Sequence, residues 1–324
     1  MTTLVTGAAG FIGHFVCLQL LQQGEQVVGL DNLCNPSEQR LKADRLARLK
    51  HPSLTFVQQD ITDGPKLQQL FAEGDFDHVI HLAAEAGVQQ GADNPQAFVN
   101  SNVVGFNHLL ECCRQHPPQQ LIYASTAAVY GDTDTLPTPE IADSSRPLTL
   151  YAATKKTNEV MAHSYAHLYG LTVTGLRFFT VYGPWGRPDM ALSLFAERIT
   201  TGQAIELHNH GKHTRDMIYI DDLVRALLAV WRQPPKHQPD STPHQLFNLG
   251  HEHPNTLQDM VDALQRLLGQ STELRGVDRQ PGVVLDNHAD ASLFGQHYGF
   301  KPDTPFAVGL AHFVDWYRDY HRLN

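Results

Sequence analysis

The sequence predicts an α/β protein: a Rossmann-type, doubly wound parallel sheet with a smaller C-terminal α+β lobe that would hold a substrate. Short aliphatic or β-branched runs alternate with amphipathic stretches up to about residue 124, and a glycine-rich turn follows the first run. The segment 183–188 (GPWGRP) breaks this alternation, and long irregular stretches follow it. A length of 324 residues leaves room for both parts.

The expected strands are short runs rich in Val, Ile, Leu and Thr. They cover 3–6, 26–30, 54–58, 77–81, 120–124 and 172–178. The helices expected between them carry apolar residues at helical spacing and cover 11–23, 38–50, 65–73, 96–116 and 149–169. Strands joined by helices in this way pair in parallel.

The domain boundary is expected near residue 180. Residues 1–180 would form the Rossmann domain and 181–324 mainly the smaller lobe, with segments near 216–250 returning to the first domain. Later helices are expected at about 190–201, 221–232, 256–268 and 304–321.

Composition and charge argue against several classes of function. The net charge of -10 opposes a nucleic-acid partner, because binding to nucleic acid depends on clustered Lys and Arg. No apolar run approaches the roughly 20 residues of a membrane helix, and no basic region precedes an apolar stretch at the N-terminus. We therefore expect no membrane partner and a cytoplasmic location. The four cysteines lack CxxC spacing and are expected to be reduced thiols.

Histidines are numerous but show no metal-ligand pattern. His208, His210 and His213 form the densest group, and they lack the helical pairing of a zinc site. They are interpreted as a solvated surface, and no metal site is expected.

The glycine-rich turn predicts a dinucleotide site. The run 5–13 (VTGAAGFIG) contains Gly7, Gly10, Phe11, Ile12 and Gly13. Glycines between a strand and a helix let the backbone approach a pyrophosphate, whose charge meets the helix N-terminus. Asp31 ends the next strand, where its carboxylate would accept hydrogen bonds from the adenosine ribose. Because that carboxylate would repel a 2′-phosphate, NAD is favoured over NADP.

The third and fourth strands end in further candidates for the same site. Asp60 and Ile61 could contact the adenine edge, and Leu82, Ala83 and Ala84 offer small side chains beside the phosphates and ribose. Ligands of parallel sheets bind at these carboxyl ends.

Tyr151 and Lys155 are the candidate catalytic pair. They stand four residues apart at the start of an expected helix, so both lie on one face, and the ammonium of Lys155 would lower the pKa of the tyrosine. The strand before this helix ends near Thr126, which presents a hydroxyl at the ligand-binding edge of the sheet. Thr126 is therefore the expected partner hydroxyl.

With these residues in place, the sequence resembles the extended short-chain dehydrogenase/reductase superfamily over essentially the whole chain. Segments 150–156 (LYAATKK) and 177–190 (RFFTVYGPWGRPDM) are similar to those of UDP-glucuronate 4-epimerases of polysaccharide pathways. The resemblance implies an isomerase with tightly bound NAD, which Asn32 and Phe178 would also contact, and a UDP-sugar substrate. It also implies a homodimer formed by the helices 96–116 and 149–169.

The resemblance implies a reversible oxidation at the sugar C4. Ionised Tyr151, assisted by Thr126, would take the proton of the 4-hydroxyl while hydride leaves C4 for NAD+. Lys155 would hold the nicotinamide ribose. The 4-keto sugar would turn over and take the hydride back on its other face.

Substrate contacts follow from the same resemblance. Thr180 and Arg187 are candidates for the sugar carboxylate, and Arg215 and Arg279 for the pyrophosphate, since arginine suits bidentate phosphate contacts.

Several residues leave other substrates and reactions open. Ala127 and Ala128 stand where relatives tend to carry serines, Gln89 where they carry arginine, and Glu85 where glutamine is usual. A neutral UDP-hexose, UDP-pentose or N-acetylated sugar is therefore an alternative substrate. The same alanines provide no acid for a dehydratase or decarboxylase. A non-catalytic NAD-sensing module is disfavoured, because Tyr151 and Lys155 are both present.

Overall fold

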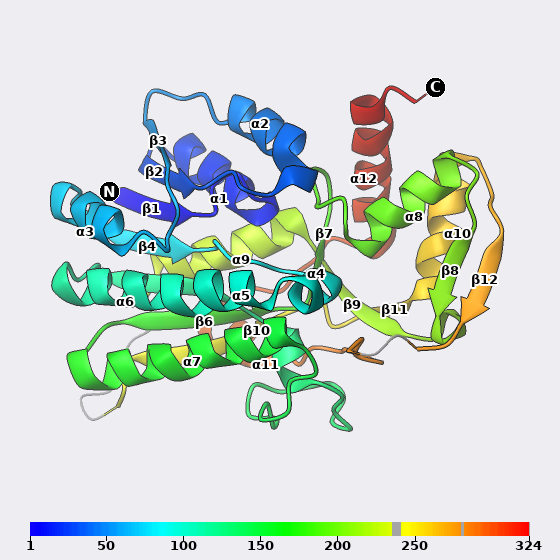
Figure 1. Ribbon diagram of the computed structural model, residues 1–324. Coiled ribbons are helices and arrows are strands. Elements are labelled where there is room, and N and C mark those ends of the chain that lie inside the picture. Colours follow the sequence, from blue (N-terminus) through cyan, green and yellow to red (C-terminus); the bar gives the residue numbers. More distant parts are fainter. Residues whose placement is uncertain (235–240, 280–281, 324) are drawn as a thin grey trace.

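A parallel sheet of seven strands forms the centre of the molecule, in the spatial order β10-β6-β5-β4-β1-β2-β3 (Figure 1). The structure, a computed structural model, describes residues 1–234, 241–279 and 282–323. The strands are β1 (Thr2–Thr6), β2 (Gln26–Asp31), β3 (Leu54–Gln58), β4 (His78–His81), β5 (Gln120–Thr126), β6 (Val173–Phe178) and β10 (His244–Leu249). The strand order reverses at β1 and β4, and ligands of such sheets bind at the carboxyl ends there.

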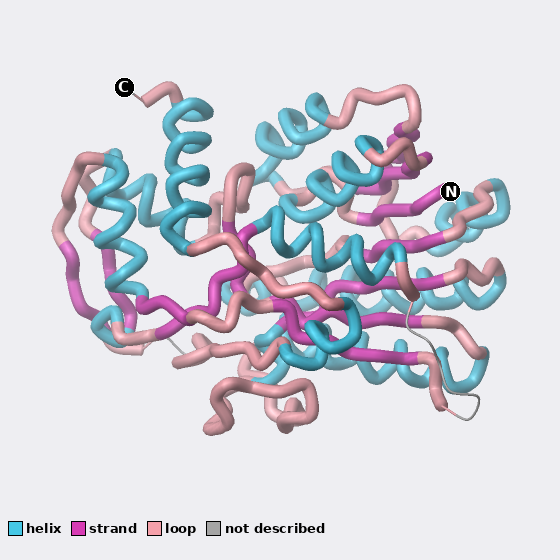
Figure 2. Tube along the Cα trace, turned by 180° about the vertical axis from the view of Figure 1, so that it is seen from behind, coloured by secondary structure: helices cyan, strands magenta, loops and turns pink. Residues whose placement is uncertain are grey.

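Helices cover both faces of the sheet, which is the doubly wound arrangement that the sequence predicts. One face packs against α3 (Gly64–Glu73), α6 (Phe106–Gln115) and α7 (Leu150–Tyr169), with Phe71, Leu109 and Ala162 in the core. The other packs against α1 (Phe11–Gln22), α9 (Ile220–Arg232) and α11 (Ser292–Tyr298), which lie in front of the strands in Figure 2. A further helix, α2 (Gln39–Arg48), lies beside α1.

Two elements from the second half of the chain join the sheet domain. β10 pairs in parallel with β6, with His244 opposite Val173. From α9, the indole Nε1 of the buried Trp231 donates to Thr3 Oγ1 at 3.1 Å. Both elements lie in the segment 216–250 that was expected to return, whereas the domain boundary near residue 180 stays a prediction.

The rest of the C-terminal half forms small sheets and helices at one end of the central sheet (Figure 1). One sheet has the order β11-β9-β7, and a second pairs β12 with β8. The elements are β7 (Thr180–Tyr182), α8 (Ala191–Thr200), β8 (Ile205–His208), β9 (Thr214–Tyr219), β11 (Pro254–Thr256), α10 (Leu257–Leu268), β12 (Leu274–Val277) and α12 (Phe306–His321). Their buried side chains, such as Phe195, Leu264 and Phe313, continue the core of α1 and α9.

The single helix expected at 96–116 is interrupted. It consists of α5 (Pro95–Val99), a π-helical turn at Asn100–Gly105 and α6, and a short helix α4 (Val88–Asp93) precedes it. At Gly105 a Cβ atom would lie 2.7 Å from the Ile61 side chain, so the π turn packs directly against the segment after β3. Such turns often occur at functional sites, and this one places Asn102 beside the catalytic helix.

Two further expectations concern the described residues. All four cysteines are unpaired, as predicted. No helix in the described part of the chain is long and apolar enough to cross a membrane.

Candidate active site

The turn between β1 and α1 leaves no room for side chains. Gly7 has φ of +74°, and a Cβ atom on it would lie 2.8 Å from the Ala83 backbone nitrogen. A Cβ on Gly13 would lie 2.0 Å from the Gly7 carbonyl oxygen. The amide nitrogen of Gly7 donates to the Leu30 carbonyl at 2.7 Å, which holds the turn against the end of β2. This cradle at a helix N-terminus fits the pyrophosphate of a dinucleotide.

A cavity of about 320 Å³ opens above this turn. It is lined by nearly all the residues predicted to bind the cofactor: Gly7, Gly10, Phe11, Ile12, Gly13, Asp31, Asn32, Ile61, Leu82, Ala83, Ala84, Tyr151, Lys155 and Phe178. Asp60 is missing from this lining. Its carboxylate instead accepts from Asn32 Nδ2 at 2.8 Å and from Thr62, because the side chain folds back over its own turn. Asp60 therefore positions Asn32.

Asp31 is almost completely buried at the wall of this cavity. Its carboxylate accepts from the Ala9 and Leu33 amides at 3.1 and 2.9 Å, and it pairs with the ammonium of Lys42 at 2.8 Å. Lys42 also lines the cavity, and the sequence analysis missed it. The sequence gives little indication that Lys42 lines a site, because a lysine on an amphipathic helix is usually solvated. The carboxylate and the ammonium together offer an acceptor and a donor to a ribose diol.

The predicted catalytic residues meet at the inner end of this cavity. Tyr151 and Lys155 lie in the first two turns of α7, which the Thr149 side chain caps by accepting from the Ala152 amide at 3.1 Å. Thr126 ends β5 and lines the same cavity as Tyr151, and its hydroxyl acts to lower the pKa of that tyrosine. Asn102 Nδ2 donates to Thr154 Oγ1 at 3.0 Å and thereby fastens the π turn to α7. The sequence-predicted trio is thus brought together.

The pKa of Tyr151 differs from the expectation. Burial raises it, while the charge of Arg187 and the Thr126 hydroxyl act to lower it. Burial lowers the pKa of Lys155 to about 8, against the raising effect of Glu159. The net shift of the tyrosine pKa is therefore upward and not downward as predicted, because desolvation of the buried phenol outweighs the groups that favour its ionised form.

A buried ion pair lies directly behind the catalytic trio. Glu159 follows Lys155 by one helical turn and accepts from Arg177 Nε and Nη2 at 2.7 and 2.8 Å, and both side chains are only 2% exposed. Glu159 also accepts from Ser125 Oγ at 2.7 Å, next to Thr126. The guanidinium of Arg177 continues the network by donating to the Tyr130 hydroxyl at 2.8 Å. These contacts fix the ends of β5 and β6 relative to α7.

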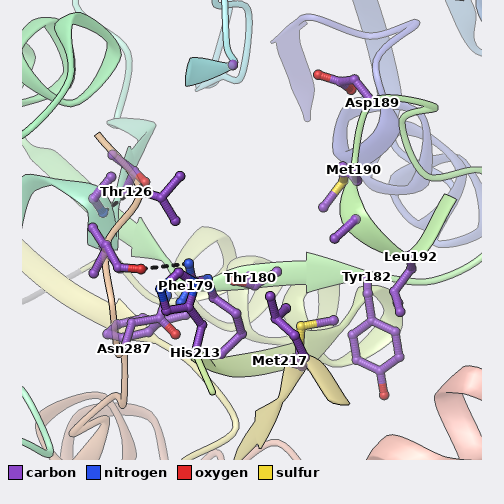
Figure 3. A pocket seen from close by; sticks show the side chains of 18 of the residues that line it. Thr126, Phe179, Thr180, Tyr182, Asp189, Met190, Leu192, His213, Met217 and Asn287 are labelled. Atoms are coloured by element: carbon purple, nitrogen blue, oxygen red, sulfur yellow. Dashed lines mark hydrogen bonds between the residues drawn. The ribbon is translucent and has the colours of Figure 1, made fainter. Parts of the chain in front are cut away.

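A second cavity of about 780 Å³ continues from Thr126 and Tyr151 into the C-terminal part. Figure 3 shows side chains that line this cavity: Thr126 at the end of β5, Thr180 from β7 and Met217 from β9, with Phe179 beside His213. The volume suits a ligand of several hundred daltons. Thr126, Tyr151, Phe178, Thr180 and Arg187 line both cavities, so a molecule in each would meet at Tyr151.

Arg187 is held at this junction by three groups. It donates from Nε and Nη2 to the Asp189 carboxylate at 3.0 and 2.5 Å and from Nη2 to the Ala86 carbonyl at 3.1 Å. A carboxylate oxygen of Glu38 lies 4.0 Å from its Nε. The cation thus stands close enough to Tyr151 to affect its pKa.

The two arginines predicted for the pyrophosphate have different surroundings. Arg215 lines the larger cavity and donates to the carbonyls of Thr214, Leu285 and Val284 at 2.7, 2.9 and 2.7 Å. Arg279 does not line it. Its guanidinium pairs with Asp132 at 2.5 Å, because the segment carrying it docks on the loop at 131–133.

Ala127, Ala128, Glu85 and Gln89 are the residues that differ from the pattern of the similar epimerases. Ala127 and Ala128 line the larger cavity beside Thr126. Glu85 lines only the cofactor cavity and not the larger one, and its backbone amide donates to Asn102 Oδ1 at 2.8 Å. The side chain of Gln89 lies outside the described residues.

The interpretation of the histidine group as solvated surface is wrong for His213. Its side chain is 1% exposed, lines the larger cavity and has no hydrogen-bond partner on either ring nitrogen within the described chain. Burial lowers its pKa, with Arg215 acting in the same direction. The residue is buried because the segment around Asp286 packs over it, which local sequence does not reveal. His213 is therefore a neutral donor and acceptor at the far end of this cavity.

Comparisons with known proteins agree with this geometry. Residues 3–250 match the model of the NAD dependent epimerase/dehydratase family. The chain is 43% identical to UDP-glucuronate 4-epimerase 4 of Arabidopsis thaliana, covering 99% of this chain and 76% of the relative. It is 40% identical to Protein CapI of Staphylococcus aureus, covering 99% and 100%. UDP-glucuronic acid 4-epimerase from Bacillus cereus, solved with UDP-glucuronic acid and NAD, superposes with a TM-score of 0.89 at 30% identity, covering 99% and 100%.

Proposed function

Since this chain belongs to the NAD dependent epimerase/dehydratase family, we propose that it interconverts UDP-glucuronate and UDP-galacturonate at the sugar C4. One observation carries the proposal. Thr126, Tyr151 and Arg187 stand together where the cofactor cavity opens into the larger cavity. A hydroxyl acid/base and a cation are thus available to the same sugar ring.

The residues supply both halves of a reversible oxidation. The Tyr151 oxygen takes the proton of the 4-hydroxyl, and the Thr126 hydroxyl, which acts to lower the tyrosine pKa, would donate a hydrogen bond to the phenolate. The bound cofactor would accept hydride from C4 in its oxidised form, NAD+, and return it in its reduced form, NADH. Gly7, Gly10, Gly13 and Asp31 would hold the pyrophosphate and ribose of that cofactor. After the keto sugar has turned over, Tyr151 returns the proton to the other epimer.

Ala127 and Ala128 favour epimerisation over related reactions. Neither methyl group can act as the acid that elimination from C5 and C6 requires, and both line the cavity beside Thr126. The tyrosine is therefore the acid/base nearest to C4.

The carboxylate at C6 is assigned to Arg187 with Thr180. The Asp189 carboxylate balances part of the Arg187 charge. Its two hydrogen bonds with Arg187 hold the guanidinium in one orientation. A second carboxylate can share such a fork through charge-assisted hydrogen bonds. The alternative substrate is a neutral UDP-sugar, which the loss of hydroxyls at Ala127 and Ala128 favours.

The nucleotide is assigned to the far end of the larger cavity. Arg215 stands there for the pyrophosphate, and His213 offers one N–H donor and one nitrogen acceptor to the nucleotide. Arg279 is left out of this assignment, because it pairs with Asp132 away from the cavity.

A homodimer is part of the proposal. Apolar side chains remain exposed on the π turn and on α7, with Val104 at 41%, Val160 at 60% and Leu168 at 64%. A second copy would cover such a patch. A cytoplasmic location and a role in polysaccharide biosynthesis are proposed from the sequence resemblance.

The test is an incubation with UDP-glucuronate, UDP-galacturonate, UDP-glucose and UDP-N-acetylglucosamine, followed by separation of the products. We expect interconversion of the two uronates without net consumption of added NADH. Inversion of only the neutral sugars would refute the uronate assignment and support the alternative.

A further inference from the structure

Arg45 occupies a position that the helical pattern reserves for an apolar residue. Leu41, Arg45 and Leu49 follow one another at four-residue spacing along the buried side of α2, and the Arg45 side chain is 0% exposed. A guanidinium in such a place is costly unless its donors and its charge are satisfied. The contacts of Arg45 therefore show what the residue holds.

Those contacts join three segments that are far apart in the sequence. Nη1 donates to Glu38 Oε2 at 2.8 Å, just before α2, and to the Ala9 carbonyl of the glycine turn at 3.2 Å. Nη2 and Nε donate to the Trp185 carbonyl at 2.6 and 3.2 Å, and Nη2 also reaches the Gly186 carbonyl at 3.4 Å. One side chain thus connects the cofactor cradle with the loop after β7.

Arg187 directly follows the two residues whose carbonyls Arg45 binds, Trp185 and Gly186. Trp185 has a φ of +63°, a left-handed conformation that a residue with a bulky side chain rarely adopts without support from its surroundings. Glu38, the anion that balances Arg45, also lies 4.0 Å from Arg187 Nε. Arg45 therefore influences the position of the Arg187 guanidinium in two ways. It binds the backbone just before Arg187, and it shares the Glu38 carboxylate with Arg187.

We propose that Arg45 is a positioning residue for substrate specificity. It fixes the backbone at Trp185 and Gly186 so that Arg187 stands at the sugar end of the larger cavity, and it ties this placement to the cofactor turn through Ala9. Recognition of the C6 carboxylate then depends on a residue that touches neither substrate nor cofactor. The inference rests on the proposed function and adds a determinant to it.

The test replaces Arg45 with lysine. Arg45→Lys keeps the charge beside Glu38, but its one nitrogen cannot take the places of both Nη1, which reaches Ala9, and Nη2, which reaches Trp185. The matched control is Arg40→Lys on the same helix, where the side chain is 78% exposed. Four quantities are measured with saturating NAD: kcat and KM for UDP-glucuronate, the inhibition constant of UDP, and the thermal midpoint.

We expect kcat/KM for UDP-glucuronate to fall by about 10- to 100-fold in Arg45→Lys, the effect of a misplacement near 1 Å. The inhibition constant of UDP should stay within about twofold, since UDP has no sugar carboxylate, and Arg40→Lys should match the wild type. In an Arg187→Gln background, Arg45→Lys should cause little additional loss, because the two residues act in series.

Three outcomes would overturn the proposal. An unchanged kcat/KM in Arg45→Lys would show that Arg187 does not depend on Arg45. A parallel loss of UDP affinity and UDP-glucuronate turnover would show a general structural role. A wild-type protein without activity on UDP-glucuronate would refute the proposed function itself. If Arg45→Lys does not fold, Glu38→Gln, which removes the shared anion, should show the same selective loss.

Discussion

The substitution Glu159→Gln tests the buried network behind the active site. It keeps the size of the side chain and removes its charge. Arg177 donates to both carboxylate oxygens, so one of these donors would face the amide NH2 of glutamine. Both side chains are 2% exposed, and breaking a buried pair from one side costs about 3–5 kcal/mol. The unfolding entropy is about 2.1 cal/mol/K per residue, so 1 kcal/mol shifts the midpoint of a 324-residue chain by about 1.5 °C, and the thermal midpoint should fall by roughly 4–7 °C.

Thermal unfolding followed by circular dichroism at fixed NAD concentration measures this loss. The matched control is Glu273→Gln, which removes the carboxylate of the exposed pair with Arg275, 62% and 60% exposed. Exposed pairs contribute little, so its midpoint should equal that of the wild type. A Glu159→Gln midpoint within about 1 °C of the wild type, less than 1 kcal/mol, would refute the assigned role of the pair.

The same variant should change the pH dependence of turnover. Burial lowers the pKa of Lys155 to about 8, and the Glu159 charge opposes that shift. The ammonium is present below this pH and is lost as the pH rises through it. Without Glu159 the pKa of Lys155 falls further, so the alkaline loss of kcat/KM should begin at a lower pH. A profile with the same alkaline limb in both proteins would contradict this.

Four further variants have defined outcomes. Tyr151→Phe should reduce turnover at least 100-fold, within the range of lost acid/base catalysis, while bound NAD in the purified protein stays unchanged. Gly13→Ala should abolish NAD retention, because its Cβ would meet the Gly7 carbonyl at 2.0 Å. His213→Phe should weaken UDP binding in calorimetry by about tenfold, the loss of roughly one hydrogen bond. Val160→Glu should convert the dimer into a monomer in sedimentation. The role of the glycine turn would be refuted by full NAD occupancy in Gly13→Ala. The role of His213 would be refuted by unchanged UDP affinity in His213→Phe, and the dimer surface by an intact dimer in Val160→Glu.

Local patterns were sufficient for six of the seven strands of the central sheet and for the cofactor turn, but they did not predict the strand β10. The strands β1 to β6 lie where alternating aliphatic runs predict them, and Gly7 and Gly13 serve the close backbone approach that their spacing indicates. Both features depend on residues close together in the chain, for which periodicity and glycine geometry are reliable guides.

Long-range packing decided what the sequence could not predict. His213 is buried by a segment about 70 residues further along the chain, and Arg279 pairs with Asp132, 147 positions away. The pKa of Tyr151 follows burial and Arg187 more than the helical neighbour Lys155. Arg45 gave a signal, an arginine within an apolar stripe, but its partners lie in segments that only the fold brings together.

Turnover of UDP-glucuronate carrying deuterium at C4 tests the central claim most directly. Hydride that leaves C4 and returns within one active site stays on the sugar, so UDP-galacturonate formed in ordinary water should keep the deuterium at C4 in the NMR spectrum. Loss of the label to solvent, or the absence of a C4 epimer, would contradict the account.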